Sequence, residues 1–170
     1  MSITLQPHID FIITAHQFHS KSPDKSVRLW DKKTPYSIHP VWCAMTILTE
    51  TALPKNIRVN GVLTLLYHDV LEDTNVKLPS TLKPLIIKYI RDMTFSEGIT
   101  QEMEEIWDKP KEIRLFKLYD KVSNLLDATW MSDELKIKYR EYTARLMRDV
   151  ESNYGNLNIV KLARVMTADV

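Results

Sequence analysis

Glycine is scarce in this 170-residue chain, which contains only Gly61, Gly98 and Gly155. The two common glycine-rich phosphate loops, G-x-G-x-x-G and G-x-x-x-x-G-K-[ST], are therefore excluded. Any phosphate that the protein binds must be held by side chains, by helix termini or by a metal ion.

Cysteine is nearly absent, and long apolar runs and an excess of charge of one sign are missing. The single Cys43 excludes an internal disulfide and a thiolate-rich metal site. No apolar run approaches the roughly 18 residues that span a membrane, and Met1 precedes polar residues, so we expect a cytoplasmic protein without a signal peptide. The 23 Lys and Arg balance the 22 Asp and Glu to a net charge of +1. That balance argues against nucleic-acid binding by bulk positive charge, but not against a small anionic ligand.

The apolar residues follow a helical spacing along nearly the whole chain, which predicts an all-α fold in a single domain, residues 1–170. The polar stretch 20–35, with two prolines, predicts a long loop. Caps, prolines and periodicity predict helices around 9–16 and at about 37–52, 56–73, 80–92, 99–107 (short and exposed), 110–130, 132–154 and 157–167.

The segment LLYHDVLEDT, residues 65–74, places an imidazole and three carboxylates in an otherwise apolar helix. His68 and Glu72 are four residues apart, and so are Asp69 and Asp73. In a continuous helix each pair shares one face, so two adjacent columns would each carry two polar groups.

Two other predicted helices carry chemically interesting side chains. In RLFKLYDKVSNLLDA, one polar stripe runs opposite the apolar side, formed by Lys117, Asp120, Asn124 and Asp127. In TPYSIHPVWCA, His39 lies near the start of an apolar helix. Taken alone, such a histidine is typical of a hydrogen-bonded core residue, and such a stripe is typical of a solvated helix face.

The polar groups taken together favour a metal site. Asp69 lies within an apolar run, where an unpaired buried charge costs several kcal/mol. Two carboxylates about 4 Å apart repel each other by roughly 4 kcal/mol at an effective dielectric constant of 20. A divalent cation removes both costs, and two imidazoles with two carboxylates suit manganese, iron or another six-coordinate cation.

The order His39, His68-Asp69, Asp120 resembles the H…HD…D pattern of the HD-domain metal-dependent phosphohydrolases, which are helical bundles. The similarity is closest to the hydrolase domain of the RelA/SpoT enzymes and the stand-alone small alarmone hydrolases. TPYSIHP is similar to their T-P-Y-x-x-H-P, LLYHDVLEDT to L-L-H-D-x-x-E-D-T, and KLYDKVSNL to K-L-A-D-K-x-x-N-L. The resemblance covers about residues 10–145.

The resemblance implies a role for each matching residue. The metal, manganese in this family, would be held by His39, His68, Asp69 and Asp120. Glu72 and Asp73 would be the catalytic pair that handles the attacking water. The substrate would be contacted by Arg28, Tyr36, Lys117, Asn124, Lys138 and Tyr142.

The loop before TPY departs from the family pattern. The family has an R-K or R-R-K run there, whereas this chain has KSVRLWDKK, with Leu29 or Trp30 where a lysine is expected. Lys32 or Lys33 is one substitute for the missing base contact, and stacking of Trp30 on a purine is another. Packing of Trp30 against the first helix is the structural alternative.

The resemblance implies hydrolysis of guanosine 3′,5′-bis(diphosphate), ppGpp or pppGpp, to GDP or GTP plus pyrophosphate. Two alternatives stay open at this level. One is an HD-domain phosphohydrolase that acts on another nucleotide or dinucleotide phosphate. The other is a non-catalytic nucleotide-binding regulator with the same fold. In each case the expected partner is a small nucleotide, not a nucleic acid or a membrane.

Overall fold

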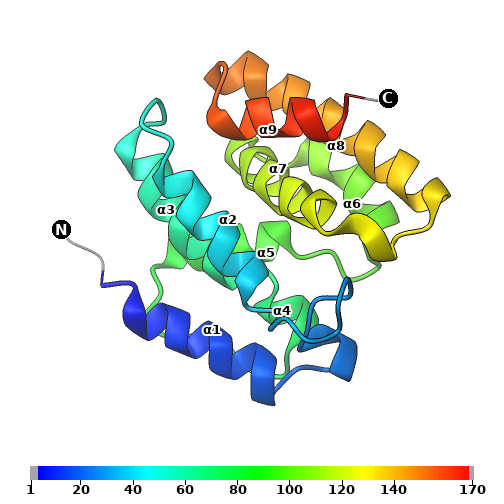
Figure 1. Ribbon diagram of the computed structural model, residues 1–170. Helices are drawn as coiled ribbons and strands as arrows, with labels where there is room; N and C mark the ends of the chain where they lie inside the picture. The colour runs from blue at the N-terminus through cyan, green and yellow to red at the C-terminus, as the bar shows by residue number, and fades with distance from the viewer. Residues whose placement is uncertain (1–3, 169–170) are drawn as a thin grey trace.

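Helices make up nearly all the regular structure in the computed structural model, which describes residues 4–168 (Figure 1). Within these residues there is no β-strand, only two isolated bridges, Ser20–Thr74 and Val27–Pro35. The all-α prediction is confirmed. The α-helices are α1 (Gln6–Phe18), α2 (Ile38–Leu48), α3 (Lys55–Tyr67), α4 (Val70–Asp73), α5 (Pro84–Met93), α6 (Ile99–Glu105), α7 (Lys111–Leu126), α8 (Asp133–Tyr154) and α9 (Asn158–Met166). Three short 3₁₀ turns join them, η1 (Pro23–Lys25), η2 (Ile106–Asp108) and η3 (Ala128–Trp130).

Helix α7 lies at the centre of the bundle, where it packs against α2, α3 and α5 on one side and α8 and α9 on the other. Figure 1 shows α2 and α3 side by side in front of α5, with α8 and α9 on the other side of α7 from α2. The polar side chains of α2, of α7 and of the segment after α3 therefore meet inside the bundle. None of the helices within residues 4–168 combines the length and the apolar character needed to cross a bilayer.

Gly61 allows the close packing of α3 against α2 and α7. A Cβ atom at this position would lie 2.5 Å from Ile47 Cδ1 and 2.8 Å from Phe116 Cε1, both on fully buried side chains. Real Cβ atoms are almost never that close to another carbon, so the helix crossing needs a residue without a side chain. The close approach at Gly61 therefore positions the second half of α3, which leads directly to His68 and Asp69.

Two predicted helices differ from the observed ones in ways that matter for the site. The helix predicted at 56–73 ends at Tyr67, and the short helix α4 follows after His68 and Asp69. The prediction of an exposed helix at 99–107 is also wrong in part, because Glu102 and Ile106 are buried. Residues 1–3 and 169–170 lie outside the described part, so the span 1–170 for the domain stays a prediction.

Candidate metal centre and adjoining cavity

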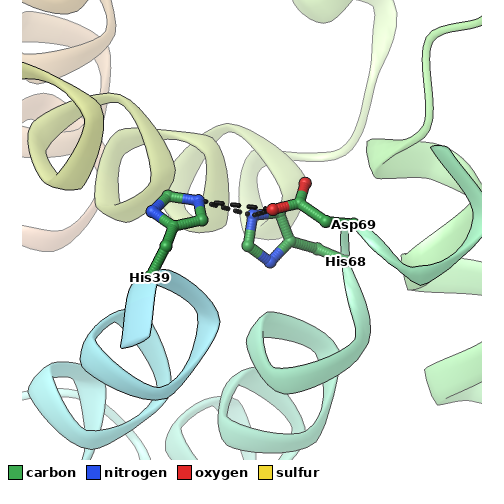
Figure 2. A group of neighbouring side chains, drawn as sticks. All are labelled: His39, His68 and Asp69. Carbon is green, nitrogen blue, oxygen red and sulfur yellow. Dashed lines mark hydrogen bonds and ion pairs between the residues drawn. The ribbon is translucent and has the colours of Figure 1, made fainter. Parts of the chain in front are cut away.

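Four buried side chains from three segments converge on one point. His39 comes from the first turn of α2, His68 and Asp69 follow α3, and Asp120 lies in the second half of α7. His39 Nε2 is 3.2 Å from His68 Nε2, 3.4 Å from Asp69 Oδ2 and 3.4 Å from Asp120 Oδ1. His68 Nε2 is 3.2 Å from Asp69 Oδ2 and 3.9 Å from Asp120 Oδ1. Figure 2 shows the first three of these side chains pointing toward one another.

The break between α3 and α4 explains how neighbouring residues reach the same point. Asp69 lies between the two helices with φ −90° and ψ −5°, still in the right-handed helical region but away from the values of a regular helix. The chain resumes with α4, whose last residue donates its backbone N–H to the carbonyl of Asp69 at 2.8 Å. In an unbroken helix, consecutive side chains point about 100° apart, whereas here His68 and Asp69 both face α2 and α7.

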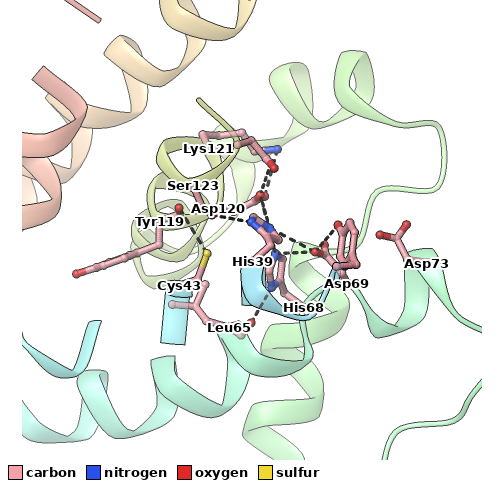
Figure 3. A network of polar contacts seen from close by, with 12 residues as sticks. His39, Cys43, Leu65, His68, Asp69, Asp73, Tyr119, Asp120, Lys121 and Ser123 are labelled. Atoms are coloured by element: carbon pink, nitrogen blue, oxygen red, sulfur yellow. Dashed lines mark hydrogen bonds and ion pairs between the residues drawn. The ribbon is translucent and has the colours of Figure 1, made fainter. Parts of the chain in front are cut away.

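The outer nitrogens of both imidazoles are occupied, which leaves the inner nitrogens free to bind. His68 Nδ1 donates to the carbonyl of Leu65 at 2.7 Å, so in the neutral ring Nε2 carries a lone pair. His39 Nδ1 is 2.7 Å from Ser123 Oγ, and Nε2 of His39 again faces inward (Figure 3). Such a hydrogen bond on the far nitrogen orients a metal-binding histidine and fixes its tautomer.

The donor set fits a divalent cation. Four side chains that can each donate an electron pair to a metal meet here, and two of them are carboxylates, so the cluster is rich in negative charge. Burial lowers the pKa of His68, but Asp69 and Asp120 outweigh burial and raise that pKa to about 9. The cluster therefore attracts positive charge, and the close group His39, His68 and Asp69 has the spacing of a metal site.

The two predicted catalytic carboxylates lie in α4 and have different partners. Glu72 Oε1 accepts the backbone N–H of Phe95 at 2.9 Å. Burial is the main cause that raises the pKa of Glu72, with Asp69 and Asp120 adding to it and Lys117 opposing it. Asp73 is buried and forms a 2.7 Å ion pair with Lys25, so its charge is already neutralised. Of the pair, Glu72 is the one better suited to accept a proton.

The long loop after α1 holds α4 in place. Lys21 Nζ donates to the carbonyls of Leu71 and Glu72, each at 2.8 Å, and the Lys21 backbone N–H donates to the carbonyl of Asp73 at 2.8 Å. These bonds satisfy carbonyl groups at the end of a helix, where no further turn exists to accept them. The sequence predicted the loop but gave no reason to assign Lys21 and Lys25 to it as anchors.

A cavity of about 280 Å³ adjoins the four converging side chains. Two of the four, Asp69 and Asp120, line it, together with both catalytic candidates. Among the predicted substrate contacts, the structure brings four to this cavity: Arg28, Tyr36, Lys117 and Asn124. The remaining lining residues are Asp24, Lys25, Val27, Leu29, Phe95, Gly98, Ile99, Glu102, Lys121, Trp130 and Tyr139.

Two predicted substrate contacts do not line the cavity. Lys138 is exposed and pairs with Glu134, one turn earlier on α8, at 3.0 Å. Tyr142 is buried, and its hydroxyl donates to Glu102 Oε1 at 3.0 Å. Trp30 does not line this cavity either; it lines a neighbouring groove of about 310 Å³, to which Arg28 and His39 also contribute.

The predicted contacts that do line the cavity are held by protein partners. Arg28 forms a two-pronged ion pair with Asp127, at 2.6 Å through Nε and 2.9 Å through Nη2, and Nη2 also donates to Asn124 at 3.0 Å. Tyr36 donates its hydroxyl proton to Asp69 Oδ2 at 2.8 Å. Asn124 donates to Asp120 Oδ1 at 2.8 Å. These bonds orient the two carboxylates of the cluster.

Sequence reasoning missed Glu102 and Lys121, which lie at the centre of a buried ionic network. Both Lys117 and Lys121 pair with Glu102, each at 2.9 Å, and with Asp120 Oδ2, at 3.2 and 3.1 Å. One sequence pattern would have found Glu102. It shares the i, i+3, i+4, i+7 spacing of one helix face with three apolar residues, Ile99, Met103 and Ile106.

By sequence, the chain matches no family model and no curated protein. Among solved structures it is similar to a metazoan ortholog of SpoT that hydrolyzes ppGpp. The similarity has a TM-score of 0.72 at 18% sequence identity and covers 99% of this chain and 96% of that chain. The chain therefore has the helical HD-domain fold of that hydrolase, as the motif pattern predicted.

Proposed function

We propose that this protein is a metal-dependent phosphohydrolase of nucleotides, with ppGpp or pppGpp as the leading substrate and GDP or GTP plus pyrophosphate as products. The observation that carries the proposal is the convergence of His39, His68, Asp69 and Asp120 beside a cavity of about 280 Å³ that both acidic and basic side chains line. The ppGpp-hydrolysing activity of the structural neighbour and the three sequence motifs support the choice of substrate.

The four side chains would hold one divalent cation; the nitrogen and oxygen donors suit manganese, iron or another six-coordinate cation, and manganese is our proposal because it is the metal of the family that the motifs resemble. Such a cation supplies a water of lowered pKa and offsets phosphate charge. Glu72, fixed by the backbone of Phe95, would accept the proton of the attacking water. Asp73, paired with Lys25, would help to orient that water.

The cavity offers different surroundings to the two ends of a nucleotide. Part of its lining consists of the carboxylates of the metal centre with Lys117 and Lys121, which suits a phosphate group that is bound together with a cation. Leu29, Ile99 and Trp130 contribute apolar surface to the same cavity, and that surface suits a base. Trp130 is 41% exposed, so part of its side chain is accessible to a ligand.

One observation favours a second candidate, a phosphohydrolase of a nucleotide with fewer phosphates than ppGpp. Arg28 and Lys25, which line the cavity, are both paired with carboxylates. Lys117 and Lys121 are paired as well. A highly charged substrate would have to compete with these carboxylates for each cationic side chain.

Incubation of the manganese-loaded protein with a nucleotide panel, followed by identification of the products, tests the proposal. Release of pyrophosphate from ppGpp is the expected result. Release of a single phosphate from another nucleotide supports the second candidate. Saturable binding without turnover of any nucleotide contradicts both and leaves a binding protein.

A further inference from the structure

Three hydrogen-bond donors surround the Glu102 carboxylate and form an anion-binding position around it. Lys117 Nζ lies 2.9 Å from Oε2, Lys121 Nζ lies 2.9 Å from Oε1, and the Tyr142 hydroxyl donates to Oε1 at 3.0 Å. Glu102 comes from α6, the lysines from α7 and the tyrosine from α8. Two ammonium groups and a hydroxyl around one oxyanion would serve a phosphate equally well.

This carboxylate borders the cavity, at the side next to Asp120. Glu102 and both lysines line the cavity, and both lysines also contact Asp120 Oδ2. Any phosphate group that extends from the metal centre along this wall meets the lysines and Glu102 together. Glu102 is only 4% exposed, so little water is present to screen its charge from such a group.

The charge balance of the cavity also limits how many phosphates it can hold. Six carboxylates and four cationic side chains line the cavity, so the lining carries a formal charge of −2 without a cation and 0 with a divalent one. All four cationic side chains have carboxylate partners. Additional phosphates on a ligand therefore meet no surplus of positive charge.

We infer that Glu102 is a specificity-determining residue that limits how many phosphates the site accepts. Its carboxylate fills the anion position between Lys117, Lys121 and Tyr142, so a ligand phosphate must displace it or stay outside. The inference rests on the proposed function, because it concerns the same cavity and nucleotide ligands. It adds that the preferred ligand has few phosphates beyond the one at the metal centre, which favours the second candidate over ppGpp.

Calorimetric titration of the manganese-loaded full chain with GMP, GDP and GTP tests this inference without requiring turnover. For the wild type we expect affinities that differ by less than about threefold across the series. Glu102→Gln keeps the side-chain size and removes the charge, so we expect GTP to bind about tenfold or more tightly than GMP, the scale of one relieved like-charge contact. Glu102→Asp keeps the charge and should restore the wild-type ratio.

Glu104→Gln is the matched control, because it makes the same change at an exposed position of the same helix. It should leave the GTP-to-GMP ratio at the wild-type value. An unchanged ratio in a manganese-containing Glu102→Gln protein overturns the inference, as does a Gln-like ratio in Glu102→Asp. A wild type that already binds GTP tenfold more tightly than GMP overturns it even if Glu102→Gln fails to fold. Absence of binding by all three nucleotides also overturns the inference, whereas the proposed function is tested separately by turnover of the nucleotide panel that includes ppGpp.

Discussion

Replacement of Glu72 by glutamine separates the proposed proton transfer from metal binding. Glu72 Oε1 accepts the backbone N–H of Phe95 at 2.9 Å, and the carbonyl oxygen of a glutamine can accept the same hydrogen bond. The variant should therefore keep the side-chain position and lose only the ability to accept a proton. The metal-binding cluster lies in other residues, so manganese content should stay unchanged.

The expected loss in kcat is about 100-fold to 10,000-fold, the usual contribution of a positioned general base. KM should change by no more than about threefold, because the substrate contacts remain. Steady-state kinetics with the substrate identified by the nucleotide panel, together with elemental analysis of the same preparation, measure all three quantities. Glu141→Gln, at an exposed position on α8, is the matched control and should behave as the wild type.

Two results would refute this reasoning. Loss of manganese from Glu72→Gln would make Glu72 a metal ligand and remove the base from the mechanism. A kcat close to that of the wild type would transfer the proton-accepting role to another group, for which Asp73 is the nearest carboxylate on α4.

Four further substitutions test the structural account. Ser123→Ala removes the partner of His39 Nδ1 and should weaken manganese binding about 10-fold to 100-fold in a metal titration, whereas unchanged affinity would show that His39 needs no such support. Trp130→Ala should raise KM about fivefold to a hundredfold with little change in kcat, because stacking of a base on an aromatic ring contributes about 1–3 kcal/mol, while Trp30→Ala should leave KM unchanged. The reverse pattern in these kinetics would move the base to the groove beside Trp30. Gly61→Ala should lower the free energy of unfolding by about 1–3 kcal/mol in urea, and an unchanged value would mean that the neighbouring side chains yield without cost.

The sequence predicted the fold class and most helix positions because apolar spacing, prolines and caps are local features. It did not predict the break after Tyr67, since LLYHDVLEDT has the composition of a continuous helix and contains no glycine or proline. Tertiary contacts hold the segment that follows the break, among them the bonds from Lys21 to the carbonyls of Leu71 and Glu72 in α4. Such long-range bonds leave no periodic pattern in the sequence.

The candidate site, like the fold, was predicted only in part from the sequence. The four proposed metal ligands were predicted from three motifs, and the structure brings them together. The sequence did not predict the ion pairs of the long loop and of α6. The pairing of Lys25 with Asp73 and of Glu102 with two lysines joins segments far apart in the chain. Trp30 was considered as a stacking residue, whereas Trp130 is the tryptophan that lines the cavity.

The central claim, one metal site built from four buried side chains, is tested most directly by calorimetric titration of the metal-free protein with Mn²⁺. We expect one ion bound per chain by the wild type, and no saturable binding by His68→Ala or Asp69→Ala. A wild type that binds no divalent cation, or a His68→Ala protein that still binds one Mn²⁺ with wild-type affinity, would contradict the account.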